Sequence, residues 1–332
     1  MKYLSAALVI VALAATAAAD LNQQFLDEYA RALPNLLGRY VQNKKVVAAG
    51  RVFDRLAPTG SLVNTGTVTS VSDETSVRSN GTNDAGGKST NPAGGILVTA
   101  DQAYQVETSD GKTYIIASHV SPSVGRLQYE MSVRGTCLYF PLSYGGGRRI
   151  IDCFDPPQER WKDRYVITSR EDTKLAGKPT VKLTIKETLG TTARLYLDRA
   201  NDLAFLRYEA DGWIDPKTKK RTSYMVVGEL TYTATAAGPM PSRFESYLLK
   251  PDGTRVPQEE YTFTTYESYT PQRSDFDLEK QFGLKPLPPP MASGSSRTAG
   301  RSWWWLYAIA AALALVTAGL VVAARRRRVR AG

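Results

Sequence analysis

The sequence predicts an α+β protein in which one amphipathic helix packs on a large antiparallel sheet, with a single membrane helix at the C-terminus. An apolar stripe of helical period runs through residues 20–41, and β-rich runs separated by turn signals follow it. Residues 303–324 carry no charge and are long enough to cross a bilayer. We therefore expect one exported domain, residues 20–285, between two membrane-type ends.

Residues 1–19 have the pattern of a secretory signal peptide. Lys2 provides a positive start, a short apolar run follows, and three small residues end at Ala19, just before Asp20. The alternative is a buried or membrane helix, which the short apolar run disfavours. We expect cleavage before Asp20 and export of the domain that begins there.

The first element of the exported part is predicted to be an amphipathic helix over residues 20–41. Its apolar residues recur at spacings of three to five and form one stripe. They are Leu21, Phe25, Leu26, Tyr29, Leu33, Leu36, Leu37 and Tyr40. Pro34 should kink or divide this helix, since proline lacks the N–H that an interior helical position donates.

About eight to eleven strands, mostly antiparallel, are predicted after the helix. Asp110-Gly111 and Asp252-Gly253 each lie between β-rich runs, which is a strong hairpin signal. In residues 180–187, apolar and polar side chains alternate, so this strand should have one buried and one wet face. In residues 203–210, Leu203 and Phe205 alternate with Leu206 and Tyr208, so apolar groups are expected on both faces near the start of this strand.

Residues 79–95 contain no large apolar side chain and are rich in glycine, which predicts a mobile loop. The GGKS sequence at residues 86–89 resembles the end of a phosphate-binding loop. The first glycine of that motif would fall at position 82, which is Thr82. A phosphate site is therefore not expected.

Cys137 and Cys153 are the two cysteines of the chain. In an exported protein a disulfide between them is the default expectation, and a pair of buried thiols is the alternative. Their spacing is far from Cys-X-X-Cys, which disfavours redox catalysis.

No catalytic residue, cofactor or metal site is predicted. His119 is the sole histidine and stands at the expected end of a strand, without the sequence context of a catalytic triad. The alternative is an enzyme that uses a pair of carboxylates far apart in the sequence. The favoured expectation is a protein without catalysis.

The C-terminal part is predicted to hold the domain at a membrane. Residues 286–302, rich in proline, glycine and serine, form a stalk before the membrane helix of residues 303–324. An aromatic belt precedes the helix at Trp303, Trp304 and Trp305. A basic cytoplasmic tail, residues 325–332, follows with Arg325, Arg326, Arg327 and Arg328. The alternative to a retained anchor is a processed C-terminal sorting signal.

The net charge of +10 belongs mostly to the ends of the chain. Eight of the 42 basic residues lie in the signal peptide, stalk and tail, so the exported domain is at about +2, nearly neutral. Nucleic acid is therefore not expected as a partner, and membrane lipid is contacted through the C-terminal helix.

The order of elements resembles the LolA/RseB-like group, the outer-membrane lipoprotein-sorting-protein-like domains. The resemblance rests on Tyr196-Leu197-Asp198 followed by Leu203 and Leu206-Arg207, and on Gly238-Pro239-Met240-Pro241 before Ser242-Arg243-Phe244. It covers the layout of residues 20–285. It implies an unclosed β half-barrel with helices on its concave face, and a cavity that binds acyl chains or a peptide without catalysis. The C-terminal membrane helix departs from the family pattern and argues against ferrying between membranes.

The expected function is that of a tethered extracytoplasmic binding module for a lipid, lipoprotein or other apolar ligand. Strand alternation gives the candidate cavity residues Phe25, Tyr29, Leu183, Leu195, Leu197, Phe205 and Tyr232. The alternative is an interaction or scaffold protein of the envelope with a filled core, whose partner is another envelope protein.

Overall fold

The computed structural model describes residues 2–54, 61–82, 93–99, 102–109, 112–120, 137–144, 148–154, 165–187, 191–212 and 222–287. Those up to Pro286 belong to one compact unit, and Leu287 begins a second unit. The predicted stalk after Leu287, the membrane helix with its tryptophans and arginines, the basic tail and most of the glycine-rich loop lie outside the described residues. Among the helices that are described, none is both long and apolar enough to span a bilayer.

Helix α1 runs without interruption over Lys2–Tyr40 and includes Pro34. Pro34 therefore does not divide the helix, and the alternative prediction of a kink there stays a prediction. Proline removes one backbone hydrogen bond, whereas the buried side chains of Tyr29 and Leu36 hold the helix on both sides of it. The predicted signal peptide forms the first half of this helix, and its cleavage stays a prediction.

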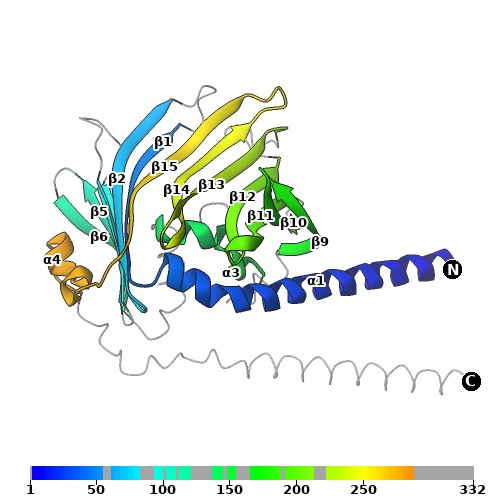
Figure 1. The fold of residues 1–332 in the computed structure, drawn as a ribbon, viewed down its shortest axis with the longest axis horizontal. Helices are drawn as coiled ribbons and strands as arrows, with labels where there is room; N and C mark the ends of the chain where they lie inside the picture. Colours follow the sequence, from blue (N-terminus) through cyan, green and yellow to red (C-terminus); the bar gives the residue numbers. More distant parts are fainter. Residues whose placement is uncertain are drawn as a thin grey trace, which may run out of the picture. The chain divides into compact units, whose positions relative to one another are not determined.

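One sheet of 13 antiparallel strands forms the body of the protein (Figure 1), in the order β6-β5-β4-β3-β2-β1-β15-β14-β13-β12-β11-β10-β9. Its strands are β1 (Lys44–Phe53), β2 (Leu62–Ser72), β3 (Val77–Gly81), β4 (Ala93–Val98), β5 (Gln102–Ser109), β6 (Lys112–Val120), β9 (Tyr165–Leu175), β10 (Lys178–Glu187), β11 (Thr192–Asp198), β12 (Ala204–Asp211), β13 (Met225–Thr235), β14 (Gly238–Leu249) and β15 (Arg255–Ser268). The end strands β6 and β9 do not pair, so the curved sheet stays open.

The sheet contains more strands than the eight to eleven predicted, and β3 shows why. Its sequence, VRSNG, has neither apolar alternation nor β-branched residues beyond Val77. Pairing with β2 on one side and β4 on the other makes it a strand. A two-stranded ribbon, β7 (Ser143–Tyr144) with β8 (Arg148–Arg149), completes the described strands.

Both hairpin predictions agree with the strand pairing. Strands β5 and β6 pair on either side of residues 110 and 111, which are themselves not described. Between β14 and β15, Gly253 adopts a φ of 83°, and the Asp252 carboxylate accepts a hydrogen bond from Thr254 N at 2.9 Å. This turn brings β15 back beside β14, and β15 then pairs with β1.

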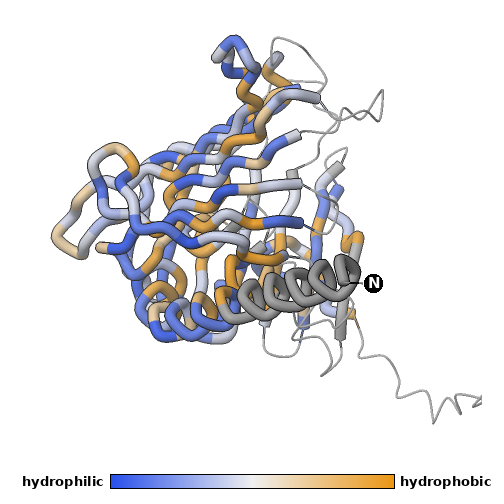
Figure 2. Tube along the Cα trace, turned by 90° about the vertical axis from the view of Figure 1, so that its right-hand side faces the viewer, coloured by the Kyte–Doolittle hydropathy of each residue, from blue (hydrophilic) through white to orange (hydrophobic). Residues whose placement is uncertain are grey.

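The concave face of the sheet is apolar. In β10, Val181, Leu183 and Ile185 are at most 1% exposed, which confirms the predicted alternation. Alternating hydropathy along the strands is visible in Figure 2. In β12 a bulge places Phe205 opposite Leu197 and Tyr208 opposite Leu195, so these two rings share a face that strict alternation would have denied them. Both aromatic rings therefore join the same interior cluster.

The opposite, convex face carries rows of charge. Glu229, Glu245 and Glu260 lie directly opposite one another on β13, β14 and β15. Three carboxylates in register repel each other, and Arg243 and Arg255 counter this by each bridging two of them at 2.9–3.9 Å. The paired charges suit a face that is in contact with water and not covered by another layer of secondary structure.

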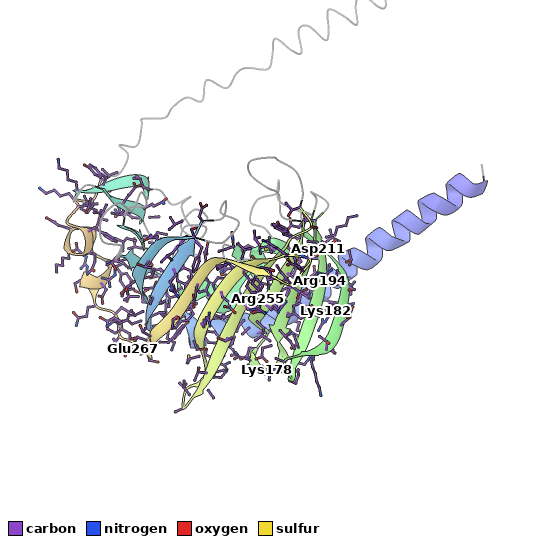
Figure 3. The ribbon with its side chains drawn as sticks, turned by 90° about the horizontal axis from the view of Figure 1, so that it is seen from above. Lys178, Lys182, Arg194, Asp211, Arg255 and Glu267 are labelled. Carbon is purple, nitrogen blue, oxygen red and sulfur yellow. The ribbon has the colours of Figure 1, made fainter. Side chains whose placement is uncertain are left out.

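Similar pairs continue toward β9. Arg194 of β11 binds Asp211 of β12 at 3.1 Å, and Lys182 of β10 binds Glu171 of β9 at 3.2 Å. Lys182, Arg194 and Asp211 lie on neighbouring strands (Figure 3). These groups are partly exposed, so each pair contributes at most about 1 kcal/mol.

The C-terminal segment covers the other end of the sheet with the 3-10 helix η5 (Arg273–Phe276) and helix α4 (Leu278–Phe282). Leu278 packs with Leu97, Tyr104 and Val106 in a second apolar cluster. Asp277 caps α4 and accepts hydrogen bonds from the first turn. The Asp275 carboxylate lies 3.7 Å from the Arg78 guanidinium, which is nearly buried on β3.

Candidate ligand-binding interior

The interior of the half-barrel is lined from three directions. The concave face supplies apolar side chains of β9 to β15 and β1, and α1 supplies Phe25, Tyr29, Leu36 and Tyr40, all fully buried. In Figure 1, α1 passes along the open side of the curved sheet, close to α3. All of these side chains belong to one continuous cluster, which we call the interior cluster.

Two short segments form the third side. The 3-10 helix η2 (Cys137–Leu142) contacts α1, β1, β2 and β12, and helix α3 (Ile150–Phe154) contacts α1 and β9. Phe140 of η2 stacks on Phe244 with ring centroids 4.4 Å apart and lies 5.3 Å from the ring of Tyr261. Phe154 of α3 meets Phe25 edge-on at 5.2 Å. Helical segments thus insert aromatic rings into the curve of the sheet.

The structure brings the seven predicted cavity residues together. Phe25, Tyr29, Leu183, Leu195, Leu197 and Phe205 are at most 2% exposed and belong to the interior cluster. Tyr232 is partly buried, packs against the cluster and donates its hydroxyl to Phe205 O at 2.8 Å. Sequence reasoning missed η2 and α3, because their apolar residues lie in short runs without a helical or strand period.

The C-terminal end of α1 is tied to the sheet by polar contacts. The Tyr40 hydroxyl donates to Pro239 O at 2.9 Å and accepts from Asn201 Nδ2 at 2.7 Å. Arg39 binds the Asn201 side-chain oxygen and pairs with Asp202 at 3.1 Å. From β15, Tyr266 donates its hydroxyl to Tyr40 O at 2.6 Å. This end of the helix is therefore fixed.

The partners Asn201 and Asp202 come from the turn after the Tyr196-Leu197-Asp198 motif. Asp198 ends β11 and caps the 3-10 helix η4 (Arg199–Asn201) by accepting from Ala200 N at 3.0 Å. Asp202 and Leu203 then adopt left-handed backbone angles, with φ of 52° and 62°. The motif thus forms a tight turn that directs Asn201 at α1.

Near residue 22, α1 is held to the end strand β9. Asn22 Nδ2 donates to Tyr165 O at 3.2 Å, and Asn22 Oδ1 accepts from Ile167 N at 2.8 Å. One amide side chain thereby satisfies two backbone groups of a strand that has no neighbour on this side. Arg170 of β9 also pairs with Glu28. Between the two ties, the buried face of α1 packs through Phe25, Tyr29 and Leu36, which belong to the interior cluster.

The tyrosines of this interior include Tyr29, Tyr40, Tyr232 and Tyr266, whose hydroxyls differ in their partners. Tyr40, Tyr232 and Tyr266 donate to backbone carbonyls, whereas the Tyr29 hydroxyl is buried and has no hydrogen-bond partner among the described residues. Burial raises the pKa of all four phenols, so each stays protonated at neutral pH.

A charged pair lies beside Tyr29. Arg149 binds Asp152 through Nε and Nη2 at 3.2 and 3.1 Å, and both side chains are mostly buried. Burial lowers the pKa of the Arg149 guanidinium, and Asp152 opposes that shift. Arg149 is therefore held within the fold by an ion pair. Its partner three residues later falls in α3, which the sequence did not indicate.

The predicted disulfide is not formed, and both cysteines are buried free thiols. Cys137 begins η2 in the interior cluster, and burial raises its pKa to about 12. The Cys153 thiol donates to Arg149 O at 3.6 Å. Cys137 lies in η2 and Cys153 lies in α3, so the structure agrees with the alternative prediction of two buried thiols.

The described residues offer little for catalysis. Within them, no three histidine, cysteine or acidic side chains gather as a metal site would require. His119 lies near the end of β6, as the sequence predicted, and its side chain is outside the described part. The interior instead offers apolar surface and one unpaired hydroxyl.

The comparisons with known proteins gave matches among solved structures alone. No known protein family and no curated protein matches the chain. It is similar to a putative outer membrane lipoprotein-sorting protein domain from Vibrio parahaemolyticus, with 13% identity, a TM-score of 0.43 and coverage of 74% of this chain and 94% of the other. It is also similar to a DUF1329 family protein from Desulfovibrio piger, with 9% identity, a TM-score of 0.44 and coverage of 77% and 97%.

A third similar structure is LprF from Mycobacterium bovis, at 14% identity and a TM-score of 0.25, with coverage of 82% and 96%. The description of the first of the three structures is that of the group that the sequence resembles. What the present protein binds is inferred from its own residues.

Proposed function

We propose that this protein is a membrane-tethered, extracytoplasmic binding module that holds an acyl chain of a lipid or lipoprotein in its half-barrel, without catalysis. The observation that carries the proposal is the interior cluster, which is apolar from the sheet, from α1 and from the η2 and α3 segments at once. Ligand sites for apolar molecules have this lining, with few polar groups.

The way α1 is attached supports this proposal. Its polar ties lie at its end near residue 40 and near residue 22, and the helix between them packs largely by apolar contact. Apolar contacts are not directional, so an acyl chain can replace one apolar neighbour with another at little cost. The ties keep the helix in place while its middle adapts.

Tethering and topology rest on the sequence features of the two ends. A signal peptide at residues 1–19 and a span at 303–324 with arginines after it put the domain outside and the tail inside. Protease added to the outer side of the membrane in intact spheroplasts should digest the domain and leave a tag after Gly332 intact. Digestion of the tag, or protection of the domain, would contradict this topology.

Lipid mass spectrometry tests the ligand. The full chain and a control protein are extracted from the same cells. The control has the same signal peptide and residues 286–332 but an unrelated exported domain. We expect an acyl-chain species enriched with the full chain, at a ratio approaching one per protein. Identical lipid profiles for the two proteins would refute the proposal, since the anchor alone would then account for all bound lipid.

A second candidate function, an envelope protein-protein interaction with a filled core, is favoured by one observation. Tyr114 and Ile116 are about half exposed on β6, an end strand whose outer edge has no partner in the sheet. A strand of another protein can add to such an edge. Chemical crosslinking from residues of β6 to one envelope protein, together with identical lipid profiles, would support this alternative.

A further inference from the structure

The unpaired hydroxyl of Tyr29 separates this residue from the other tyrosines of the interior. Its side chain has no exposed surface, and its oxygen has no hydrogen-bond partner in the described part of the chain. The hydroxyls of Tyr40, Tyr232 and Tyr266 each bind a backbone carbonyl. Buried hydroxyls are almost always paired, so an unpaired one in the interior needs an explanation.

The surroundings of Tyr29 are apolar on one side and charged on the other. Its ring lies 5.5 Å from the ring of Phe25, which in turn contacts Phe154. The electrostatic influences on the Tyr29 hydroxyl come from Arg149, Asp152 and Cys153 of β8 and α3. Helix α3 also contacts α1, so the hydroxyl stands between the apolar interior and the Arg149–Asp152 pair.

A group placed there must accept a hydrogen bond. Burial raises the pKa of Tyr29, so the phenol keeps its proton and acts as a donor at neutral pH. A hydrocarbon alone would leave this donor unpaired, and the rest of the ligand must be apolar to match Phe25 and Phe154. An acyl chain that ends in a carbonyl oxygen satisfies both requirements.

We propose that the Tyr29 hydroxyl binds the carbonyl oxygen of an acyl ligand, with the chain along the interior cluster and the carbonyl beside the Arg149–Asp152 pair. This inference rests on the proposed function and names the ligand class. A free carboxylate and an ester both supply the required oxygen, and the experiment distinguishes them.

The test uses the full chain in nanodiscs, after extraction of bound lipid, with three photoactivatable probes of equal chain length. One is a diazirine fatty acid, one is its methyl ester and one is the matching hydrocarbon. Crosslinks on peptides that contain Phe25, Tyr29 or Phe154 are quantified against probe concentration. Labelling of these peptides, rather than of residues 303–324, reports occupancy of the interior.

We expect the wild-type interior to bind a carbonyl-bearing probe about five- to tenfold more tightly than the hydrocarbon, and Tyr29→Phe to abolish this preference. Binding of the acid alone identifies a free carboxylate, and equal binding of acid and ester identifies the carbonyl as sufficient. If the wild type binds all three probes equally, the inference is overturned and the proposed function stands. If no probe labels the interior, the proposed function fails as well.

Stability measurements supply the control. Tyr29→Phe removes an unpaired hydroxyl, so without ligand its resistance to urea, read by pulse proteolysis, should equal or exceed that of the wild type. Tyr266→Phe removes a paired hydroxyl, so it should unfold at lower urea and keep the preference for carbonyl probes. A loss of stability in Tyr29→Phe would overturn the inference, because the hydroxyl would then be paired, for instance with water, in the ligand-free protein.

Discussion

Replacing Tyr40 by phenylalanine removes one oxygen atom from the point where α1 meets the sheet. That oxygen takes part in two hydrogen bonds, to Pro239 O at 2.9 Å and from Asn201 Nδ2 at 2.7 Å. Each bond contributes about 1 kcal/mol net, and a buried partner left unpaired costs about 1–3 kcal/mol. Asn201 is 2% exposed and keeps its bond from Arg39, so we expect a loss of about 2–4 kcal/mol in the free energy of unfolding.

The matched control is Tyr29→Phe, the same chemical change on the same helix, at a side chain that is equally buried. Because the Tyr29 hydroxyl has no partner, its removal should cost nothing. Urea unfolding of the full chain, followed by pulse proteolysis, gives both free energies. Equal losses in the two variants would refute the reasoning, because burial of a phenol, rather than its hydrogen bonds, would then set its contribution.

Three further predictions concern other parts of the fold. Gly228→Ala should lower the free energy of unfolding by about 1–3 kcal/mol, since its Cβ would lie 2.2 Å from the Tyr208 ring; an unchanged urea midpoint would contradict this. Asp275→Asn should lower the free energy of unfolding by about 1–3 kcal/mol, because it removes the charge that faces Arg78. It should also speed hydrogen exchange in residues 273–282. Exchange as slow as in the wild type would argue against a role of Asp275 in anchoring this segment to β3. The free energy of unfolding should fall from about pH 9 upward. In the folded protein burial raises the pKa of Cys137 and of the interior tyrosines, so above that pH the unfolded chain releases protons that the folded chain keeps. A urea midpoint that stays flat between pH 8 and 11 would rule this out.

The strand β10 and the turn at Asp252-Gly253 could be predicted because their information is local. Alternation in β10 needs only the two-residue period of a strand, and Gly253 needs only a backbone that tolerates positive φ. The stripe on α1 likewise placed Phe25 and Tyr29 in the interior, where the structure has them.

The strand β3 and the segments η2 and α3 could not be predicted, because their conformation comes from neighbours distant in the sequence. The polar strand β3 exists through pairing with β2 and β4. Phe140 is held by Phe244 and Tyr261, which are about a hundred residues away along the chain. A bulge likewise moved Phe205 and Tyr208 to the same face, which strict alternation forbids.

The sequence by itself determined the class of this protein: one amphipathic helix, a large antiparallel sheet and a nearly neutral domain between two apolar ends. Periodicity and composition are properties of neighbouring residues, so they can be read without coordinates. The tertiary structure alone decided that the two cysteines form no disulfide, that Arg149 is buried with Asp152 and that the Tyr29 hydroxyl has no partner within the described residues. Each of these depends on which side chains meet across the fold, and the physical reason is that pairing and burial are set by long-range contacts.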